Sequence, residues 1–214
     1  MPSYDGDTML HYVTILAGIA AIHWAALISP GPNFLLISQA SSAESRRAGL
    51  WTALGVVIGT VTWATAALLG VSVIFSQFVW VYKGMKFLGG AYLVYLGVRA
   101  WVGATRPIQP GQTAPTAPSH WLALRRGFLT HITNPKTALF YAGIFAATLT
   151  PDLPQWVKAA AFGVVLADSL IWHSTLALVF STDRAQRAYL RAKLWVDRIT
   201  GTVMTAFGTA LALS

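Results

Sequence analysis

Charged residues are scarce in this chain, and cysteine is absent. Asp, Glu, Lys and Arg make up 10% of the 214 residues, against about a quarter in soluble domains. The lack of cysteine excludes disulfide bonds, thiol relays and cysteine nucleophiles. The sequence also has no HExxH or similar metal-binding spacing, no nucleophile elbow and no phosphate-binding loop, so nothing in it calls for a metal, a cofactor or ATP.

Apolar sequence is abundant instead. Hydrophobic residues account for 55% of the chain, and several segments approach or exceed the roughly 20 apolar residues that span a bilayer as a helix. The ten-residue alternation of an outer-membrane barrel is missing. We therefore expect an all-α integral membrane protein embedded in the lipid bilayer. Its expected transmembrane segments cover residues 9–42, 49–75, 78–101, 127–149, 155–180 and 199–213.

The net charge of +8 comes from basic residues that lie between the apolar segments. This placement is typical of the positive-inside rule and argues against a nucleic-acid partner. The bases gather in alternate loops, so one side collects them and should be cytoplasmic, which places both termini outside. The bases that set this orientation are Arg46, Arg47, Arg99, Arg106, Arg125, Arg126, Arg184, Arg187, Arg191, Lys193 and Arg198. No Lys or Arg precedes the first apolar segment, so we expect that segment to be retained rather than cleaved as a signal.

A change of composition divides the chain. Residues 102–120 are rich in Pro, Gly, Gln and Thr, as expected for a flexible cytoplasmic linker. Three apolar segments precede it in residues 1–101, and three follow it in residues 121–214. Because each half has an odd number of segments, the halves should enter the membrane in opposite senses, as inverted three-helix repeats do.

The first apolar segment is interrupted by Ser-Pro-Gly-Pro-Asn at 29–33. Pro30 and Pro32 lack the N–H that a helix interior needs, and Gly31 between them lets the backbone bend. Unpaired backbone groups at membrane depth survive only where protein or a water-filled cavity covers them. The stretch is therefore either a polar site or a plain loop at a helix end.

A second interruption, Thr-Asn-Pro-Lys at 133–136, occurs in the first segment of the second half. Paired Gly/Pro interruptions at corresponding positions of two halves indicate the binding site of a transporter, whereas two unrelated kinks are the alternative. The predicted substrate site accordingly contains Pro30, Gly31, Pro32, Asn33, Asn134, Pro135 and Lys136.

Such a site suits a zwitterion. We expect Asn33 to cap a short helix at 34–42, whose N-terminal N–H groups would favour a carboxylate. Lys136 is a second partner for a carboxylate, unless its side chain stretches to the cytoplasmic interface. Ammonium acceptors would come from the carbonyls that the breaks free, namely those of Ala26, Ile28 and His131, and from the two asparagine amides.

Asp168 is the strongest single candidate, because a carboxylate in the middle of the fifth segment is costly unless it pairs or binds a proton. It could exchange a coupling proton, hold a substrate ammonium, or make a structural hydrogen bond. Trp172 lies one turn away on the same face and could add a cation–π wall, although buried Trp is more often packing. His173 faces away from Asp168. We interpret His23 and His131 as structural residues near the breaks.

Glycines recur in the second and third segments. Gly55, Gly59 and Gly70 lie in one, and Gly90 and Gly97 in the other. Small residues at such spacings let a second helix approach closely. They would serve a homodimer interface as readily as internal packing.

Several of these motifs together resemble a known family. The sequence reads SPGPN at 29–33, SRRAGL at 45–50, FLGGAYLVYLG at 87–97 and TNPK at 133–136, and this order is similar to the lysine exporter and homoserine/threonine exporter (LysE/RhtB) family. The resemblance covers nearly the whole chain. It implies proton-coupled secondary export of amino acids or their derivatives across the bacterial inner (plasma) membrane. A passive facilitator or channel is the alternative, followed by a membrane enzyme acting on a polar or lipid-linked substrate.

Overall fold

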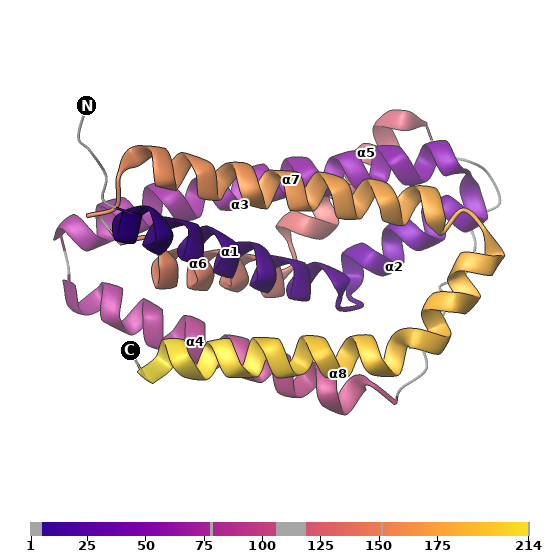
Figure 1. Ribbon diagram of the computed structural model, residues 1–214. Coiled ribbons are helices and arrows are strands. Elements are labelled where there is room, and N and C mark those ends of the chain that lie inside the picture. The colour runs from indigo at the N-terminus through magenta and orange to yellow at the C-terminus, as the bar shows by residue number, and fades with distance from the viewer. Residues whose placement is uncertain (1–5, 78, 106–118, 151, 214) are drawn as a thin grey trace.

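A computed structural model describes residues 6–77, 79–105, 119–150 and 152–213. Within these ranges every regular element is helical, and the long helices run side by side (Figure 1). The Pro-rich stretch 106–118 lies outside the described residues. In chain order the elements are α1 (Gly6–Ile28), α2 (Pro32–Gln39), the π-helical turn η1 (Ala40–Glu44), α3 (Arg46–Gln77), α4 (Val79–Gly103), α5 (His120–Ile132), α6 (Pro135–Thr148), α7 (Gln155–Val179) and α8 (Asp183–Leu213).

Both predicted breaks are confirmed as the ends of helices. α1 stops at Ile28 and α2 starts at Pro32, while α5 stops at Ile132 and α6 starts at Pro135. Proline suits the first position of a helix because the N–H that it lacks would have no partner there. In both halves proline therefore interrupts the apolar segment and also starts the helix that follows.

Two helices start earlier than expected. α5 begins at His120 rather than near 127, with the Ser119 side chain accepting the Leu122 N–H at 3.3 Å as its N-cap. α8 begins at Asp183 rather than near 199. Its added turns carry the bases of the last loop, and the Lys193–Asp197 pair at i,i+4 supports them from within the helix. Apolar content alone misses such turns because their charge interrupts the hydrophobic run.

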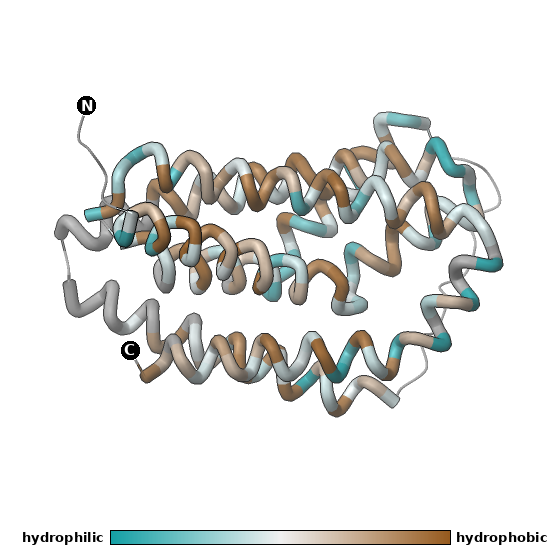
Figure 2. Tube along the Cα trace, in the orientation of Figure 1, coloured by the Kyte–Doolittle hydropathy of each residue, from teal (hydrophilic) through white to brown (hydrophobic). Residues whose placement is uncertain are grey.

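Three of the described helical stretches are long and apolar enough to cross a membrane, namely Gly6–Ile28, Arg46–Leu69 and Gln155–Val179. Apolar residues follow the helices over most of their length (Figure 2). Large apolar side chains also face outward, including Leu10, Leu69 and Ile171, each more than half exposed. These features fit a multi-pass membrane protein whose outer surface contacts lipid.

Close contact between α3 and α5 depends on glycine. A Cβ added to Gly55 would meet the Leu124 carbonyl oxygen at 2.0 Å, and one added to Gly127 would meet that of Thr52 at 2.0 Å. At Gly59 it would meet the His131 ring at 2.7 Å. Because these glycines have no side chain, α5 and the second break at its end can lie against α3.

α4 and α8 are joined in the same way and lie together along one side of the bundle (Figure 1). Gly90 faces Gly208 and Gly97 faces Gly201, each close enough that a Cβ would collide with the partner's backbone. Gly55, Gly59, Gly90 and Gly97 are therefore used for packing within the chain, which removes them as support for a dimer interface.

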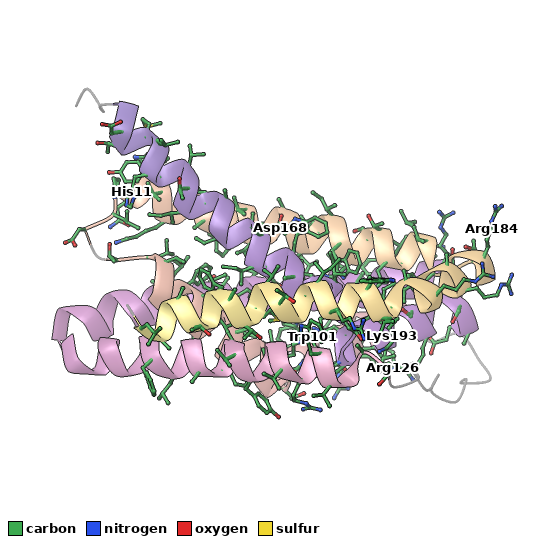
Figure 3. All side chains as sticks on the ribbon, turned by 60° about the horizontal axis from the view of Figure 1, so that its bottom comes forward. His11, Trp101, Arg126, Asp168, Arg184 and Lys193 are labelled. Atoms are coloured by element: carbon green, nitrogen blue, oxygen red, sulfur yellow. The ribbon has the colours of Figure 1, made fainter. Side chains whose placement is uncertain are left out.

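The two ends of the bundle differ. α1 begins and α8 finishes at one end, while the α2–α3 junction and the turn between α7 and α8 lie at the other (Figure 1). Arg126 and Arg184 lie toward this second end (Figure 3). There Arg126 Nη1 donates to Glu44 Oε1 at 3.0 Å, tying α5 to η1. Basic side chains thus gather at the end opposite α1's first turn.

Candidate functional site

The two breaks meet through one hydrogen bond. Asn33 Nδ2, at the start of α2, lies 2.8 Å from His131 Nδ1, in the last turn of α5. The expectation that Asn33 caps its own helix is wrong, because α2 already begins at Pro32. Its N-cap is Gly31 in extended backbone, with no side-chain hydrogen bond. Released from capping, the Asn33 amide joins the two halves instead.

A cavity lies at this junction, and its empty space of about 500 Å³ includes solvent outside its mouth. Gly31, Pro32, Asn33, Asn134 and Lys136, all predicted for the site, line it. Its remaining lining comprises His23, Ala26, Leu27, Ser29, Phe34, His131, Thr137, Phe140, Tyr141 and His173. The cavity is therefore apolar and aromatic with a few polar groups, and both breaks contribute to it.

Lys136 turns into this cavity rather than toward the membrane surface. Its Nζ lies 3.8 Å from the position that a Cβ on Gly31 would occupy, across the gap between the breaks. Within the described part of the chain, the ammonium forms no hydrogen bond or ion pair. A cation without a partner beside an open cavity is a ready site for an anionic group.

The second break is arranged differently from the first. Asn134 is the N-cap of α6, and its Oδ1 accepts the Lys136 N–H at 3.0 Å. Pro135 occupies the first helical position, and Pro30, half-buried in the first break, is not among the cavity-lining residues. The first helical N–H groups are thus capped in α6 and uncapped in α2.

Two of the three freed carbonyls, those of Ile28 and His131, are not open acceptors as expected. Ile28 O accepts the Tyr189 hydroxyl at 3.3 Å, and His131 O accepts the Asn134 N–H at 3.3 Å. Tyr189 reaches the first break from α8, stacked on Phe34 with ring centroids 4.6 Å apart. The protein thus satisfies backbone groups that would be costly to leave unpaired in a membrane.

Asp168 is buried about halfway along α7 (Figure 3), 7% exposed, and lies beside a histidine. Its Oδ2 is 3.3 Å from His23 Nδ1. The other nitrogen of that ring, Nε2, is 3.0 Å from the Tyr141 hydroxyl. His23 was predicted to be structural and is hydrogen-bonded as expected, but its partner is the carboxylate singled out in the fifth segment.

The chain of contacts continues to the breaks through Thr60 on α3. Its Oγ1 lies 3.4 Å from the Tyr141 hydroxyl, 3.0 Å from Ser169 Oγ and 3.4 Å from His131 Nε2. His131 then reaches Asn33 through its other ring nitrogen. We call this set the buried polar network. It consists of Asp168, His23, Tyr141, Thr60, Ser169, His173, His131 and Asn33.

Two further predicted positions occupy the edge of the site. His173 Nδ1 contacts the Ser169 carbonyl at 2.9 Å, and no hydrogen bond joins it to Asp168, in agreement with its expected direction. Trp172 is not among the cavity-lining residues. Its ring instead meets Trp24 edge-on with centroids 5.9 Å apart.

Sequence reasoning missed His23, Thr60, Tyr141 and Ser169 as parts of one unit. Each is a lone polar side chain in an apolar helix, which by itself looks like local packing. The available signal was that Asp168 and His23 are ionisable residues inside apolar segments of opposite halves. A buried carboxylate requires a donor, and a histidine in another segment is a natural one.

Comparison with known proteins gives consistent matches over the chain. Residues 24–214 match the family model of the LysE type translocator. The threonine efflux protein of Escherichia coli (strain K12) is 28% identical over 92% of this chain and 96% of its own length. The uncharacterized membrane protein YahN of the same organism is 31% identical over 94% of this chain and 89% of its own.

YrhP, an uncharacterized membrane protein of Bacillus subtilis (strain 168), is 27% identical over 97% of this chain and 99% of its own length. No solved structure matches the fold. The family match covers most of the sequence and includes both breaks; His23 is the one residue of the cavity lining and of the buried polar network that lies outside it. The chain therefore belongs to the LysE type translocator family and is a transporter rather than an enzyme.

Proposed function

We propose that this protein exports amino acids or their derivatives from the cytoplasm, and that the cavity between the two breaks binds the substrate. One observation carries the proposal: the cavity holds an unpaired ammonium, Lys136, facing the uncapped start of α2. The relative named as a threonine efflux protein supports the substrate class.

The substrate carboxylate binds between Lys136 and the first turn of α2. The helix start carries partial positive charge, and its N–H groups have no side-chain cap. The charged ammonium adds a hydrogen bond of the stronger, charge-assisted kind. Both groups favour an anion on the same side of the cavity.

The substrate ammonium binds at the amide of Asn33. Its Nδ2 is engaged by His131, whereas its Oδ1 is buried without a hydrogen-bond partner. An acceptor in that state gains from any donor that reaches it. The cavity thus offers cationic and acceptor groups to opposite ends of a zwitterion, with Phe140 and Tyr141 beside the side chain.

Export is coupled to protons at the Asp168 site, as an antiport. A mid-helix carboxylate is costly in a membrane and marks a proton or ion pathway by default. This one is linked by hydrogen bonds to the residues that line the cavity. Asp168 thus connects to the substrate site without being part of its lining.

The six-segment inverted repeat accounts for the packing. In each half a broken helix is followed by two long ones, and each broken helix packs on a helix of the other half, α5 on α3 and α1 on α7. We place the basic end of the bundle in the cytoplasm of a bacterium and both termini outside its inner membrane.

Transport by inverted membrane vesicles tests the proposal. We expect an imposed proton gradient, acid inside, to drive accumulation of at least one radiolabelled amino acid from a panel that begins with L-threonine, and a protonophore to abolish it. Equilibration without accumulation would indicate a passive facilitator. Failure of every panel member to enter above protein-free vesicles would overturn the proposal.

Asp168→Asn tests the coupling separately. The amide keeps the size of the side chain and an acceptor for His23 but cannot hold a negative charge. We expect gradient-driven accumulation to be lost while the protein remains folded in the membrane. Asp152→Asn, at an exposed position, is the matched control and should behave as wild type. Normal accumulation by Asp168→Asn would exclude its role in coupling.

A further inference from the structure

We infer that the coupled proton is held by His23, between Asp168 and Tyr141, and that substrate and proton exclude one another because both place a positive charge at the wall of one cavity. The inference rests on the proposed antiport and deepens it. His23 was the member of the pair that sequence reasoning regarded as structural.

The positions of His23 and Asp168 favour His23 as the residue that holds the proton. It lines the cavity, whereas Asp168 does not. Its ring is only 1% exposed, and both of its nitrogens are hydrogen-bonded, one to Asp168 and one to Tyr141. A proton that enters from water in the cavity therefore meets the imidazole before it meets the carboxylate.

Hydrogen counting gives the two states of this ring. The ionised carboxylate can only accept, so His23 Nδ1 carries a hydrogen directed at it. Nε2 is then free to accept, and it does so from the Tyr141 hydroxyl when the ring is neutral. On proton binding, a hydronium ion in the cavity loses a proton and becomes water, and an N–H bond forms at Nε2. Release from Nε2 reverses the step.

The cationic state needs a counter-charge, and among the three histidines that line the cavity only His23 has one within the described part of the chain. The ionisable side chains around it are Asp168 and His173 on α7, His131 on α5, and Tyr141 and Lys136 on α6. In the described residues, α3 and α8 form no hydrogen bond or ion pair with it. Asp168 is thus its only anionic neighbour, whereas His131 and His173 have hydroxyl, amide and carbonyl partners.

Protonation also changes the direction of the neighbouring hydroxyl. Tyr141 has one hydrogen and two partners, His23 at 3.0 Å and Thr60 at 3.4 Å. With neutral His23 the hydrogen points to Nε2. With cationic His23 the Nε2–H occupies the phenol oxygen, so Tyr141 donates to Thr60. Thr60 in turn contacts His131, the partner of Asn33.

Antiport follows from competition in the cavity. A cationic imidazolium in the wall repels the substrate ammonium, and the same charge is shielded poorly where water is scarce. By reciprocity, a bound substrate lowers the affinity of the site for the proton. Loading one therefore expels the other, as an exchanger requires.

The test uses the full chain reconstituted in liposomes with L-threonine as the probe. The first assay exchanges labelled against unlabelled threonine without a proton gradient, from about pH 5 to 8, the range in which histidine titrates. We expect the exchange KM of the wild type to rise as pH falls, by up to roughly tenfold per pH unit. The second assay measures gradient-driven accumulation.

His23→Gln retains a polar side chain but cannot titrate in this range. We expect it to lose accumulation, and the KM of the exchange that remains should not change with pH. His11→Gln, exposed in the first turns of α1, is the control and should match wild type. Gradient-driven accumulation by His23→Gln at the wild-type level would overturn the assignment to His23, and so would a wild-type pH profile in that variant.

If His23→Gln loses exchange as well, the inference is tested by Tyr141→Phe and by the pH dependence of the wild-type KM. The phenylalanine keeps the ring and removes only the hydroxyl that His23 contacts, so we expect the pH profile of the exchange KM to shift from that of the wild type. A wild-type KM that is flat over the whole range would overturn the inference. A wild type that exchanges threonine but never accumulates it would instead overturn the proposed antiport.

Discussion

The two breaks occupy corresponding places in the two halves, yet they differ in chemistry. In the second break Asn134 caps the helix that follows it. In the first break Gly31 leaves the helix uncapped, and Asn33 bonds to the other half. The second break thus caps the start of α6 and supplies Lys136 to the cavity, whereas the first break leaves the N–H groups of α2 without a side-chain cap. Two similar backbone interruptions therefore contribute different groups, an ammonium and open N–H groups, to the same anion-binding side of the cavity.

The largest expected effect comes from removing the ammonium of the second break. Lys136→Gln loses a charge-assisted hydrogen bond of about 1.5–3 kcal/mol, so the KM for a transported amino acid should rise roughly 10- to 100-fold. Arg187→Gln removes an exposed charge from α8 and serves as the control. An unchanged KM in Lys136→Gln would place the carboxylate elsewhere.

Separating the breaks is expected to cost somewhat less. In Gly59→Ala the new Cβ would lie 2.7 Å from the His131 ring, so this ring, which is hydrogen-bonded to Asn33, must shift. Overpacking of this kind costs about 1–3 kcal/mol, measurable as a lower midpoint of thermal unfolding in detergent. At Gly163 nothing lies within 4 Å of an added Cβ, so Gly163→Ala should be neutral or stabilising.

The two asparagines allow a direct contrast. Asn33→Ala leaves His131 Nδ1 buried without its partner, and we expect transport to weaken along with a loss of about 1–3 kcal/mol in stability. Asn134→Ala removes an N-cap worth about 0.5–2 kcal/mol and should lower stability with KM near wild type. Equal effects of both variants on KM would show that the breaks are chemically alike.

The smallest effect concerns the carbonyl freed by the first break. Tyr189→Phe removes the hydroxyl that bonds Ile28 O but keeps the ring stacked on Phe34. We expect a loss of about 0.5–1.5 kcal/mol in unfolding free energy. Tyr95→Phe, at a site 51% exposed, should have less effect. A larger loss in the control would contradict the role given to Ile28 O.

Local features of the sequence predicted the breaks, because the covalent structure of proline limits where it can stand in a helix. Glycine spacing likewise predicted close helix contacts, which the collisions at Gly55 and Gly97 confirm. Asp168 was singled out because a carboxylate in lipid is costly, and in the structure its side chain is buried. These properties belong to a residue and its immediate neighbours, so one sequence reveals them.

Partners across the bundle could not be predicted in this way. Asp168 meets His23 from a helix 145 positions away, and Thr60 joins three residues from three other segments. Asn33 was assigned a cap because the local pattern favours one, but Pro32 had already started the helix. The start of α8 was missed because charge hid its helical turns. Only the contacts between helices required knowledge of which helices are adjacent.

The contact between α4 and α8 has a mechanical consequence. Their backbones touch at two glycine pairs, and Lys193 Nζ on α8 donates to Gly103 O at 2.9 Å at the end of α4 while pairing with buried Asp197. Sliding one helix along the other would drive side chains into these contacts and expose a paired charge. The two helices therefore form a stiff pair, and any movement of one along the bundle must carry the other with it.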